Sequence, residues 1–254
     1  MELKDKIIVV TGGASGIGRE MCRRFAREGA KKVIVADLNG EGAASVAAEI
    51  GGFSMAVDVR KESEIVELIN TTEAQFGPID LFCSNAGIGI GKNIDEPDEV
   101  WQTIWEVNTM AHVWAARHLV PLMIARGGGY LLNTSSAAGL LNQIGSVTYA
   151  VTKHAAVALA EWLSITYGDQ GIKVSVLCPQ AVNTPLVAGG AGVAGVDGMI
   201  EPEVAVEAVV ETLREEKFLV LPHPEVAEYM KRKAADYDRW LKGMRRLQSQ
   251  YIEN

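Results

Sequence analysis

The chain has 254 residues, of which 48% are hydrophobic and 22% charged, and its formal net charge is -8. Nucleic acids and anionic membranes are bound through concentrated basic patches, so this acidic composition argues against both as partners. The chain contains no run of about 18 apolar residues, so no helix is expected to span a membrane. The N-terminal residues lack a signal-peptide pattern, and we predict a cytoplasmic protein that acts on small molecules.

Seven short apolar runs alternate with longer helical patterns along the chain. Nearly every position in these runs is apolar, which is typical of parallel strands covered by helices on both faces. We therefore predict an α/β fold, with one Rossmann-type domain over residues 1–254 and a doubly wound parallel sheet of about seven strands. The predicted strands are 7–10, 33–36, 53–57, 79–83, 130–133, 173–178 and 218–221.

A glycine-rich loop, TGGASGIG, spans residues 11–18 between the first predicted strand and an amphipathic helix. Gly12, Gly16 and Gly18 would let the backbone turn sharply and bring its N–H groups close to a pyrophosphate at the helix N-terminus. Ser15 and Ile17 lie in the same loop and are also expected to contact the dinucleotide. The spacing is TGxxxGxG rather than the usual GxGxxG, so the loop alone is weak support for cofactor binding.

The second predicted strand ends at Asp37, whose carboxylate is placed to accept hydrogen bonds from the adenosine ribose hydroxyls. A 2′-phosphate at that position would be repelled. Neither Ser15 nor Leu38 supplies a positive charge to neutralise such a phosphate, so the predicted cofactor is NAD rather than NADP. The alternative interpretation of Asp37 is a helix cap.

Two helical segments, 107–125 and 149–167, carry few charges around their whole circumference. One face on the sheet does not account for them, so we expect a second buried face in a homo-oligomer, predicted to be a tetramer. Loops of the same chain are the alternative cover. No metal is expected, because the four histidines show no ligand spacing, and the three cysteines are expected to be free thiols.

The last third of the chain contains two segments outside the strand pattern. Residues 185–200 are rich in glycine and nearly uncharged, which favours a mobile substrate lid over an ordinary surface loop. Residues 223–249 form a charged C-terminal extension whose apolar residues recur at helical spacing, and we predict one docking helix there. We expect its apolar stripe to pack against the protein rather than enter the active site.

Three motifs occur in order along the chain, namely TGxxxGxG, Asn85-Ala86-Gly87 and Tyr149-Ala150-Val151-Thr152-Lys153. Together they resemble the classical short-chain dehydrogenase/reductase family, with a match from residue 5 to about 222. The resemblance implies that Asp58, with Val59 beside it, and Asn85, Ala86 and Gly87 contact or support the adenine half of the dinucleotide.

The resemblance also implies a catalytic serine at Ser136, with Ser135 as the second choice. Asn108 resembles the asparagine whose helix position holds a water in the family's proton relay. Pro179, Val182 and Thr184 follow the sixth strand as the family's nicotinamide-binding segment does. Gln180 departs from the family, which usually has glycine there, so the edge of the pocket is expected to differ.

Tyr149 and Lys153 are four residues apart and therefore share one face of a helix. A free tyrosine has a pKa of about 10 and is a poor base at neutral pH. A lysine charge at roughly 5 Å would lower that pKa by about two units before desolvation reverses part of the effect. We predict that Ser136 binds the substrate oxygen, Tyr149 transfers its proton, and Lys153 also binds the nicotinamide ribose.

The predicted function is NAD-dependent interconversion of a secondary alcohol and its ketone. An NADPH-dependent 3-ketoacyl-type reductase and a non-catalytic dinucleotide-binding scaffold or sensor are the alternatives. No clustered arginines are apparent to bind an anion, so a neutral, apolar substrate is expected. The residues expected to line its pocket, besides Ser136, Tyr149 and Gln180, are Leu140, Leu141, Ile144, Leu186, Val187 and Val193.

Overall fold

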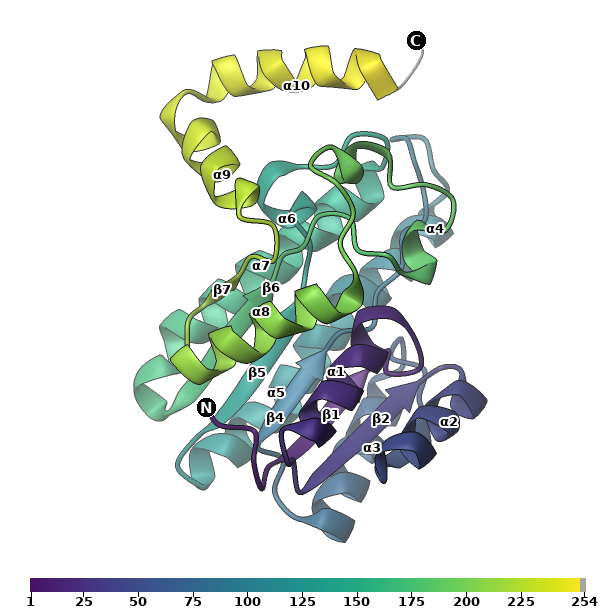
Figure 1. Ribbon diagram of the computed structural model, residues 1–254, viewed down its shortest axis with the longest axis vertical. Helices are drawn as coiled ribbons and strands as arrows, with labels where there is room; N and C mark the ends of the chain where they lie inside the picture. The colour runs from purple at the N-terminus through teal and green to yellow at the C-terminus, as the bar shows by residue number, and fades with distance from the viewer. Residues whose placement is uncertain (252–254) are drawn as a thin grey trace.

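The computed structural model describes residues 1–251, and its centre is a single parallel sheet of seven strands in the order β3-β2-β1-β4-β5-β6-β7 (Figure 1). The order reverses between β1 and β4, which creates a switch point at the carboxyl edge of the sheet. The predicted doubly wound fold is confirmed. The strands are β1 (Ile7–Thr11), β2 (Lys32–Asp37), β3 (Phe53–Ala56), β4 (Leu81–Ser84), β5 (Gly129–Thr134), β6 (Ile172–Leu177) and β7 (Leu219–Val220).

Helices cover both faces of the sheet and divide the core into two clusters. Along β1, Ile8 and Val10 point to one cluster, whereas Ile7 and Val9 point to the other. This explains why the strands read as continuous apolar runs. The first layer consists of α1 (Gly16–Arg27), α2 (Gly40–Ile50) and α8 (Pro202–Glu215), and the second of α3 (Glu62–Phe76), α5 (Ala111–Ala125) and α7 (Val147–Tyr167).

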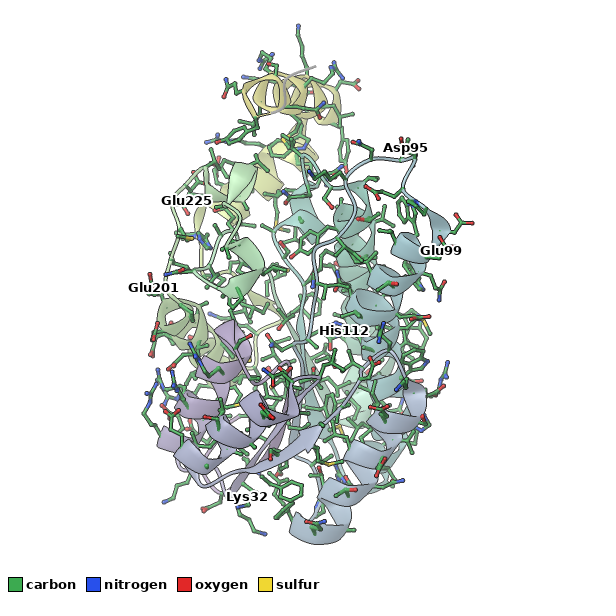
Figure 2. All side chains as sticks on the ribbon, turned by 90° about the vertical axis from the view of Figure 1, so that its right-hand side faces the viewer. Lys32, Asp95, Glu99, His112, Glu201 and Glu225 are labelled. Carbon is green, nitrogen blue, oxygen red and sulfur yellow. The ribbon has the colours of Figure 1, made fainter. Side chains whose placement is uncertain are left out.

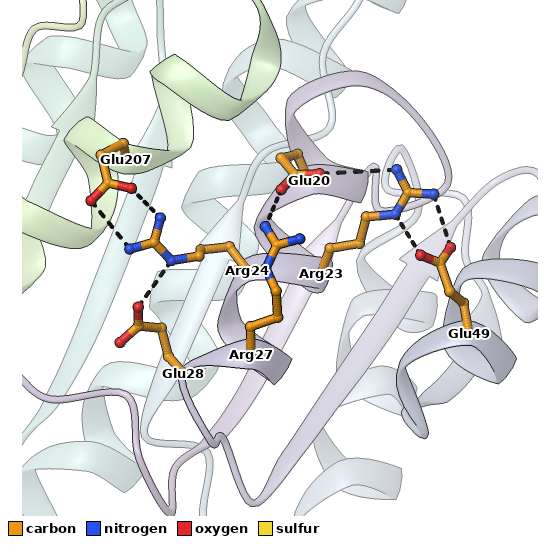
Figure 3. A network of polar contacts seen from close by, with 7 residues as sticks. All are labelled: Glu20, Arg23, Arg24, Arg27, Glu28, Glu49 and Glu207. Atoms are coloured by element: carbon orange, nitrogen blue, oxygen red, sulfur yellow. Dashed lines mark hydrogen bonds and ion pairs between the residues drawn. The ribbon is translucent and has the colours of Figure 1, made fainter.

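Helix α1 is joined to its two neighbours by a network of ion pairs (Figure 3). Arg23 binds Glu49 of α2 with an N–O distance of 2.9 Å, and Arg24 binds Glu207 of α8. Glu20, which is 4% exposed, accepts a hydrogen bond from Arg27 within α1. Exposed pairs contribute little individually, but a network with several members fixes the position of α1 and of the loop before it.

The segment predicted as a helix over 107–125 has an irregular start. Helix α4 (Asp98–Trp105) runs into a π-helical turn over Glu106–Met110, and α5 follows directly. Such π-turns often occur at functional sites. Residues 185–200 contain two short 3₁₀ turns, Pro185–Val187 and Gly192–Gly195, and a bridge joins Val182 to Ile200. The remaining short elements are α6 (Ala138–Leu141) and a 3₁₀ turn at Gly168–Gln170.

The C-terminal extension forms two helices, so the prediction of one docking helix was wrong. Helix α9 (Glu225–Ala235) packs against α6, and α10 (Tyr237–Tyr251) turns away at the end of the molecule (Figure 1). Asp236 is extended between them, and its carboxylate accepts a hydrogen bond from the backbone N–H of Arg239. Aspartate favours this N-cap geometry, so it ends one helix and starts another. Across residues 1–251, no helix is both long and apolar enough to span a membrane.

Candidate active site

A cleft of about 650 Å³ opens at the carboxyl ends of the strands, at the switch point between β1 and β4. Most residues predicted from the sequence to bind cofactor or substrate line it, although they come from distant parts of the chain. The predicted residues that line the cleft are Gly12, Ser15, Gly16, Ile17, Gly18, Asp37, Leu38, Asp58, Val59, Asn85, Ala86, Gly87, Ser136, Tyr149, Lys153, Pro179, Gln180, Val182, Thr184, Leu186 and Val187.

Four predicted pocket residues lie elsewhere. Leu140 packs into the interface between α6 and α9, and its carbonyl accepts a hydrogen bond from Lys233, so its assignment to the reaction cleft was wrong. Ile144 does not line the cleft either, and the neighbouring Gln143 takes that place. Leu141 and Val193 line an adjoining cavity instead. Leu140 and Leu141 belong to the short helix at 138–141, whereas Val193 lies in the 3₁₀ turn at 192–195, so chain order alone did not give the positions of these side chains.

The glycine-rich loop between β1 and α1 leaves room at the N-terminus of α1. Gly12 has a φ of +67°, a conformation that residues with a side chain rarely adopt. A Cβ added at Gly18 would lie 2.1 Å from the carbonyl oxygen of Gly12, so no side chain fits there. The loop is therefore packed tightly against itself, and Gly12, Gly16 and Gly18 line the cleft, where a pyrophosphate could approach their backbone.

Asp37 at the end of β2 shapes the same loop. One carboxylate oxygen accepts a hydrogen bond from the N–H of Ala14 at 3.0 Å, and the other accepts one from Asn39 at 2.9 Å. The N-cap of α2 is Asn39, whose side chain binds the N–H of Gly42, so the helix-cap interpretation of Asp37 is not needed. Asp37 lines the cleft beside the exposed Leu38, where an adenosine ribose would be bound.

Asp58, predicted from the family resemblance to contact adenine, is buried, lines the cleft and is bound by Arg60 at 2.7 Å. The Arg60 guanidinium holds the pKa of the Asp58 carboxyl below its usual value. Arg60 also lines the cleft and was missed in the sequence, where it appears as one more charge before a helix. The sequence feature that could have indicated Arg60 as a cleft residue was its position two residues after Asp58.

Asn85 ties together three neighbouring strand ends beneath the cleft. Its side-chain Nδ2 donates to the carbonyl of Thr11, and its Oδ1 accepts from the hydroxyl of Thr134 at 3.1 Å. The Thr11 hydroxyl in turn accepts hydrogen bonds from the N–H groups of Asn85 and Ala86. The predicted support role of Asn85 thus has a geometric basis in the loop after β4.

Tyr149, Lys153 and Ser136 meet at the inner end of the cleft. Lys153 Nζ lies 5.5 Å from the centroid of the Tyr149 ring and donates to the carbonyl of Thr134 at 3.1 Å. The Ser136 hydroxyl donates to the carbonyl of Pro179 at 3.3 Å. Ser135, the second choice for the catalytic serine, is buried with its hydroxyl bonded to the carbonyl of Lys153, so Ser136 is better placed for substrate.

The acid–base properties of the pair differ from those expected. Burial raises the pKa of Tyr149, and the Ser136 hydroxyl lowers it in part. Burial also lowers the pKa of Lys153 to about 8, because the residue is only 2% exposed. The expectation of a net lowering of the tyrosine pKa was therefore wrong, since desolvation raises this pKa by more than the Ser136 hydroxyl lowers it.

Asn108 lies within the π-turn and is fully buried behind the cleft. Its Oδ1 accepts from the N–H of Ile88 at 2.9 Å, and its Nδ2 donates to the carbonyl of the same residue. A Cβ added at Gly87 would lie 3.5 Å from Asn108 Oδ1 and 3.3 Å from Lys153 Nζ. Asn108 thus holds the wall at 87–88 against Lys153, and its part in a water relay stays a prediction.

Sequence reasoning missed a second buried polar pair, His112 and Asn133. His112 lies within the body of the molecule, one helical turn after Asn108 (Figure 2). Among residues 1–251, neither ring nitrogen of His112 nor Nδ2 of Asn133 has a hydrogen-bond partner. Burial lowers the pKa of His112 to about 3, so this ring is neutral. The sequence signal for His112 was its spacing of four residues from Asn108, which places these two side chains on one helix face.

Comparisons with known proteins agree with this geometry. The family model of the short chain dehydrogenases matches residues 6–190. A 1-deoxy-11-beta-hydroxypentalenate dehydrogenase of Streptomyces exfoliatus is 37% identical over 229 residues, which cover 86% of this chain and 83% of that protein. Epidermal retinol dehydrogenase 2 of Homo sapiens is 32% identical, with coverage of 85% and 74%. The chain belongs to the short chain dehydrogenase family and is an oxidoreductase.

Solved structures of the family share the fold. A short chain dehydrogenase/reductase of Burkholderia phymatum in complex with NAD superposes with a TM-score of 0.86 at 24% identity, covering 94% of this chain and 96% of that one. A 3-ketoacyl-(acyl-carrier-protein) reductase of Brucella melitensis complexed with NADH gives 0.79 at 28% identity, with coverage of 86% and 96%. The cofactor class of the family is a nicotinamide dinucleotide.

Proposed function

We propose that this chain is an NAD-dependent dehydrogenase that interconverts a secondary alcohol and its ketone. The observation that carries the proposal is the convergence of Ser136, Tyr149 and Lys153 at the inner end of a cleft that the glycine-rich loop also lines. The two relatives named above are dehydrogenases of a hydroxypentalenate and of retinol, which supports a hydroxyl-bearing substrate.

Each of the three side chains has a separate role in the proposed reaction. The Ser136 hydroxyl donates a hydrogen bond to the substrate oxygen, and Tyr149 accepts the alcohol proton during oxidation or returns it during reduction. Lys153 holds its ammonium near the phenol and favours the charged form of Tyr149 during proton transfer. When bound, the nicotinamide accepts or supplies the hydride at the adjacent carbon.

The selectivity for NAD over NADP is proposed from the adenosine end of the cleft. Asp37 places a carboxylate there, and neither Ser15 nor Leu38 offsets it with a positive charge. Arg60 also lines the cleft, but its guanidinium is engaged by Asp58. A 2′-phosphate would therefore meet an unbalanced negative charge.

We also propose that residues 185–200 close over the substrate. Leu186 and Val187 line the cleft, and Leu186 is half exposed. Added Cβ atoms at Gly189, Gly190, Gly192 and Gly198 would meet nothing within 4 Å, so the backbone there is loosely packed. This sparse packing is what a segment that opens and closes requires.

A homo-oligomer, proposed to be a tetramer in the cytoplasm, would cover the outer faces of α5 and α7. Trp162 is 55% exposed and Ile165 is 84% exposed on α7, and Leu122 of α5 and Val151 of α7 are exposed as well. Large apolar side chains gathered on two adjacent helices are typical of a subunit interface. Size measurement of the purified chain by light scattering tests this proposal.

A substrate panel tests the function directly. The purified chain is assayed by NADH absorbance with secondary alcohols of increasing size, with NAD and NADP in parallel. Turnover with NAD and little with NADP supports the proposal, whereas NADPH-linked reduction of 3-ketoacyl thioesters would favour the reductase suggested by the Brucella structure. Dinucleotide binding without turnover of any substrate would favour the scaffold or sensor, and the Tyr149→Phe variant is the inactive control.

A further inference from the structure

A second cavity adjoins the reaction cleft on the side of the C-terminal helices. Its volume is also about 650 Å³, which is in the range of pockets that hold organic ligands. The two cavities share part of one wall, including the predicted catalytic residue Ser136. The shared residues are Ser136, Gln143, Gln180 and Ala194. We call the second cavity the outer compartment; its inner end lies at Ser136.

The walls of the outer compartment are held together by specific contacts. Gln180 Nε2 donates to one carboxylate oxygen of Asp197 at 2.9 Å, and the Tyr229 hydroxyl donates to the other at 2.9 Å. Asp197 therefore joins the segment after β6, the proposed lid and α9. Gln180, the residue that departs from the family pattern, stands at the junction of the two cavities.

The lining of the outer compartment is mainly apolar. Trp240, Met244 and Leu247 of α10 face Leu141 of α6 across it, and Val193 and Val196 come from the proposed lid. These α10 residues belong to the apolar stripe seen in the sequence. The stripe was expected to pack against the protein, and part of it instead lines this open space.

Three arginines also line the compartment, although clustered arginines were not expected from the sequence. Arg232 lies over the Tyr229 ring at 5.7 Å and pairs with Glu228, whereas within residues 1–251 neither Arg239 nor Arg246 forms an ion pair. The Arg246 guanidinium passes the compartment wall at Gly243, where an added Cβ would lie 3.9 Å from Nη2. Asp236 is the acidic residue in the lining, so positive charge prevails there in a chain of net charge -8.

We propose that the outer compartment binds the distal part of the substrate, and that this part is an elongated apolar body ending in a carboxylate. The inference rests on the proposed dehydrogenase function. The reacting alcohol lies at Ser136, the apolar body passes Gln180 and lies between α6 and α10, and the carboxylate is bound by Arg239 and Arg246. Guanidinium groups suit a carboxylate in geometry as well as charge. The earlier expectation of an apolar substrate is kept, but its neutrality is not.

The test uses a matched pair of probes, dodecanoate carrying a hydroxyl on the penultimate carbon and its methyl ester, each with saturating NAD. The wild type is expected to turn over the acid with a kcat/KM at least about tenfold above that of the ester. In the double variant Arg239→Gln/Arg246→Gln, the kcat/KM for the acid should fall about tenfold because its KM rises. The kcat/KM for the ester should stay as in the wild type. Arg245→Gln is the control, because Arg245 neighbours Arg246 but does not line the compartment.

Equilibrium binding provides a second measurement that does not depend on turnover. The corresponding keto acid is titrated into the enzyme with NAD, and quenching of Trp240 is isolated by comparison with Trp240→Phe. Equal affinity of keto acid and keto ester, or an acid preference that survives the double substitution in a folded variant, would overturn the inference. Absence of turnover of any secondary alcohol would instead contradict the proposed function, so the two failures are distinguishable.

Discussion

Lys153 and Thr134 are joined by a hydrogen bond from the lysine ammonium to the backbone carbonyl at the end of β5, with a length of 3.1 Å. The bond fixes a buried positive charge next to Tyr149 and couples the catalytic helix α7 to the centre of the sheet. The charge is costly to bury, so we expect it to affect stability and catalysis in opposite directions.

The cost of burying Lys153 predicts a pH-dependent stability difference. The lysine pKa is about 8 in the folded chain, against an ordinary value of 10.5. Below pH 8 the lysine is charged in both the folded and the unfolded chain, so the full cost of burying the charge lowers the stability of the fold. Between pH 8 and 10.5 the lysine is neutral in the folded chain but still charged in the unfolded chain. The free energy of unfolding therefore rises with pH in this range. Relative to Lys153→Met, the wild type should gain about 2 kcal/mol of unfolding free energy between about pH 7.5 and 9.5.

Urea denaturation at several pH values measures this difference. Lys242→Met is the matched control, because Lys242 is exposed and its removal should leave the slope with pH unchanged. A difference between wild type and Lys153→Met that stays constant across this range would show that Lys153 is not held in a desolvated position.

Removing the Tyr149 hydroxyl should separate binding from chemistry. In Tyr149→Phe the proton acceptor is absent, and general acid–base catalysis contributes roughly 10² to 10⁴ in rate, so kcat should fall by about that factor or more. The ring itself is retained, so the NADH dissociation constant, measured by fluorescence titration, should change little. Substantial turnover by this variant would assign proton transfer to another residue.

Asp37 is predicted to set the cofactor preference. In Asp37→Asn the side chain still offers an acceptor to Ala14 or Asn39 but has lost its charge. The ratio of kcat/KM for NAD to that for NADP should fall at least about tenfold, mainly through better use of NADP. Asp37→Ala also loses the hydrogen bonds with Ala14 and Asn39, so it should weaken NAD binding as well. If the ratio is the same in Asp37→Asn and wild type, the preference originates elsewhere in the cleft.

Gly18 should not tolerate even a methyl group. In Gly18→Ala the new Cβ would lie 2.1 Å from the Gly12 carbonyl oxygen, so the loop must move. We expect NADH to bind at least about tenfold more weakly and the melting temperature to fall. Gly168→Ala is the control, since Gly168 has a helical φ of -57° and nothing within 4 Å of an added Cβ. NADH affinity equal to wild type in Gly18→Ala would mean that the loop does not bind the dinucleotide.

The fold was predictable from the sequence because its determinants are local. The apolar runs mark strands buried on both faces, and the glycines after β1 mark the loop before α1. Tyr149 and Lys153 follow the helical period, so their proximity was predictable as well. Each of these inferences depends on a few neighbouring residues, and the structure confirms the strands and places the predicted catalytic pair together.

What could not be predicted depends on contacts distant in sequence. The direction of the Tyr149 pKa shift follows from burial by several segments, which no local pattern gives. Leu140 was misplaced because α9, more than eighty residues later, packs against it. The arginines of the outer compartment are seven residues apart in the chain, and the break at Asp236 that orients them is recognisable only once α10 is seen to start there.

The two C-terminal helices, with the break between them at Asp236, have a consequence for substrate choice. Ser136, Tyr149 and Lys153 come from the middle of the chain, whereas the far wall of the outer compartment comes from α9 and α10. The two parts are encoded separately, and the sheet edge at β7 is the point where they join. A chimera that carries residues 224–251 of a homologue should therefore take on the substrate preference of that homologue. Its proton-transfer residues, Ser136, Tyr149 and Lys153, would stay those of the present chain.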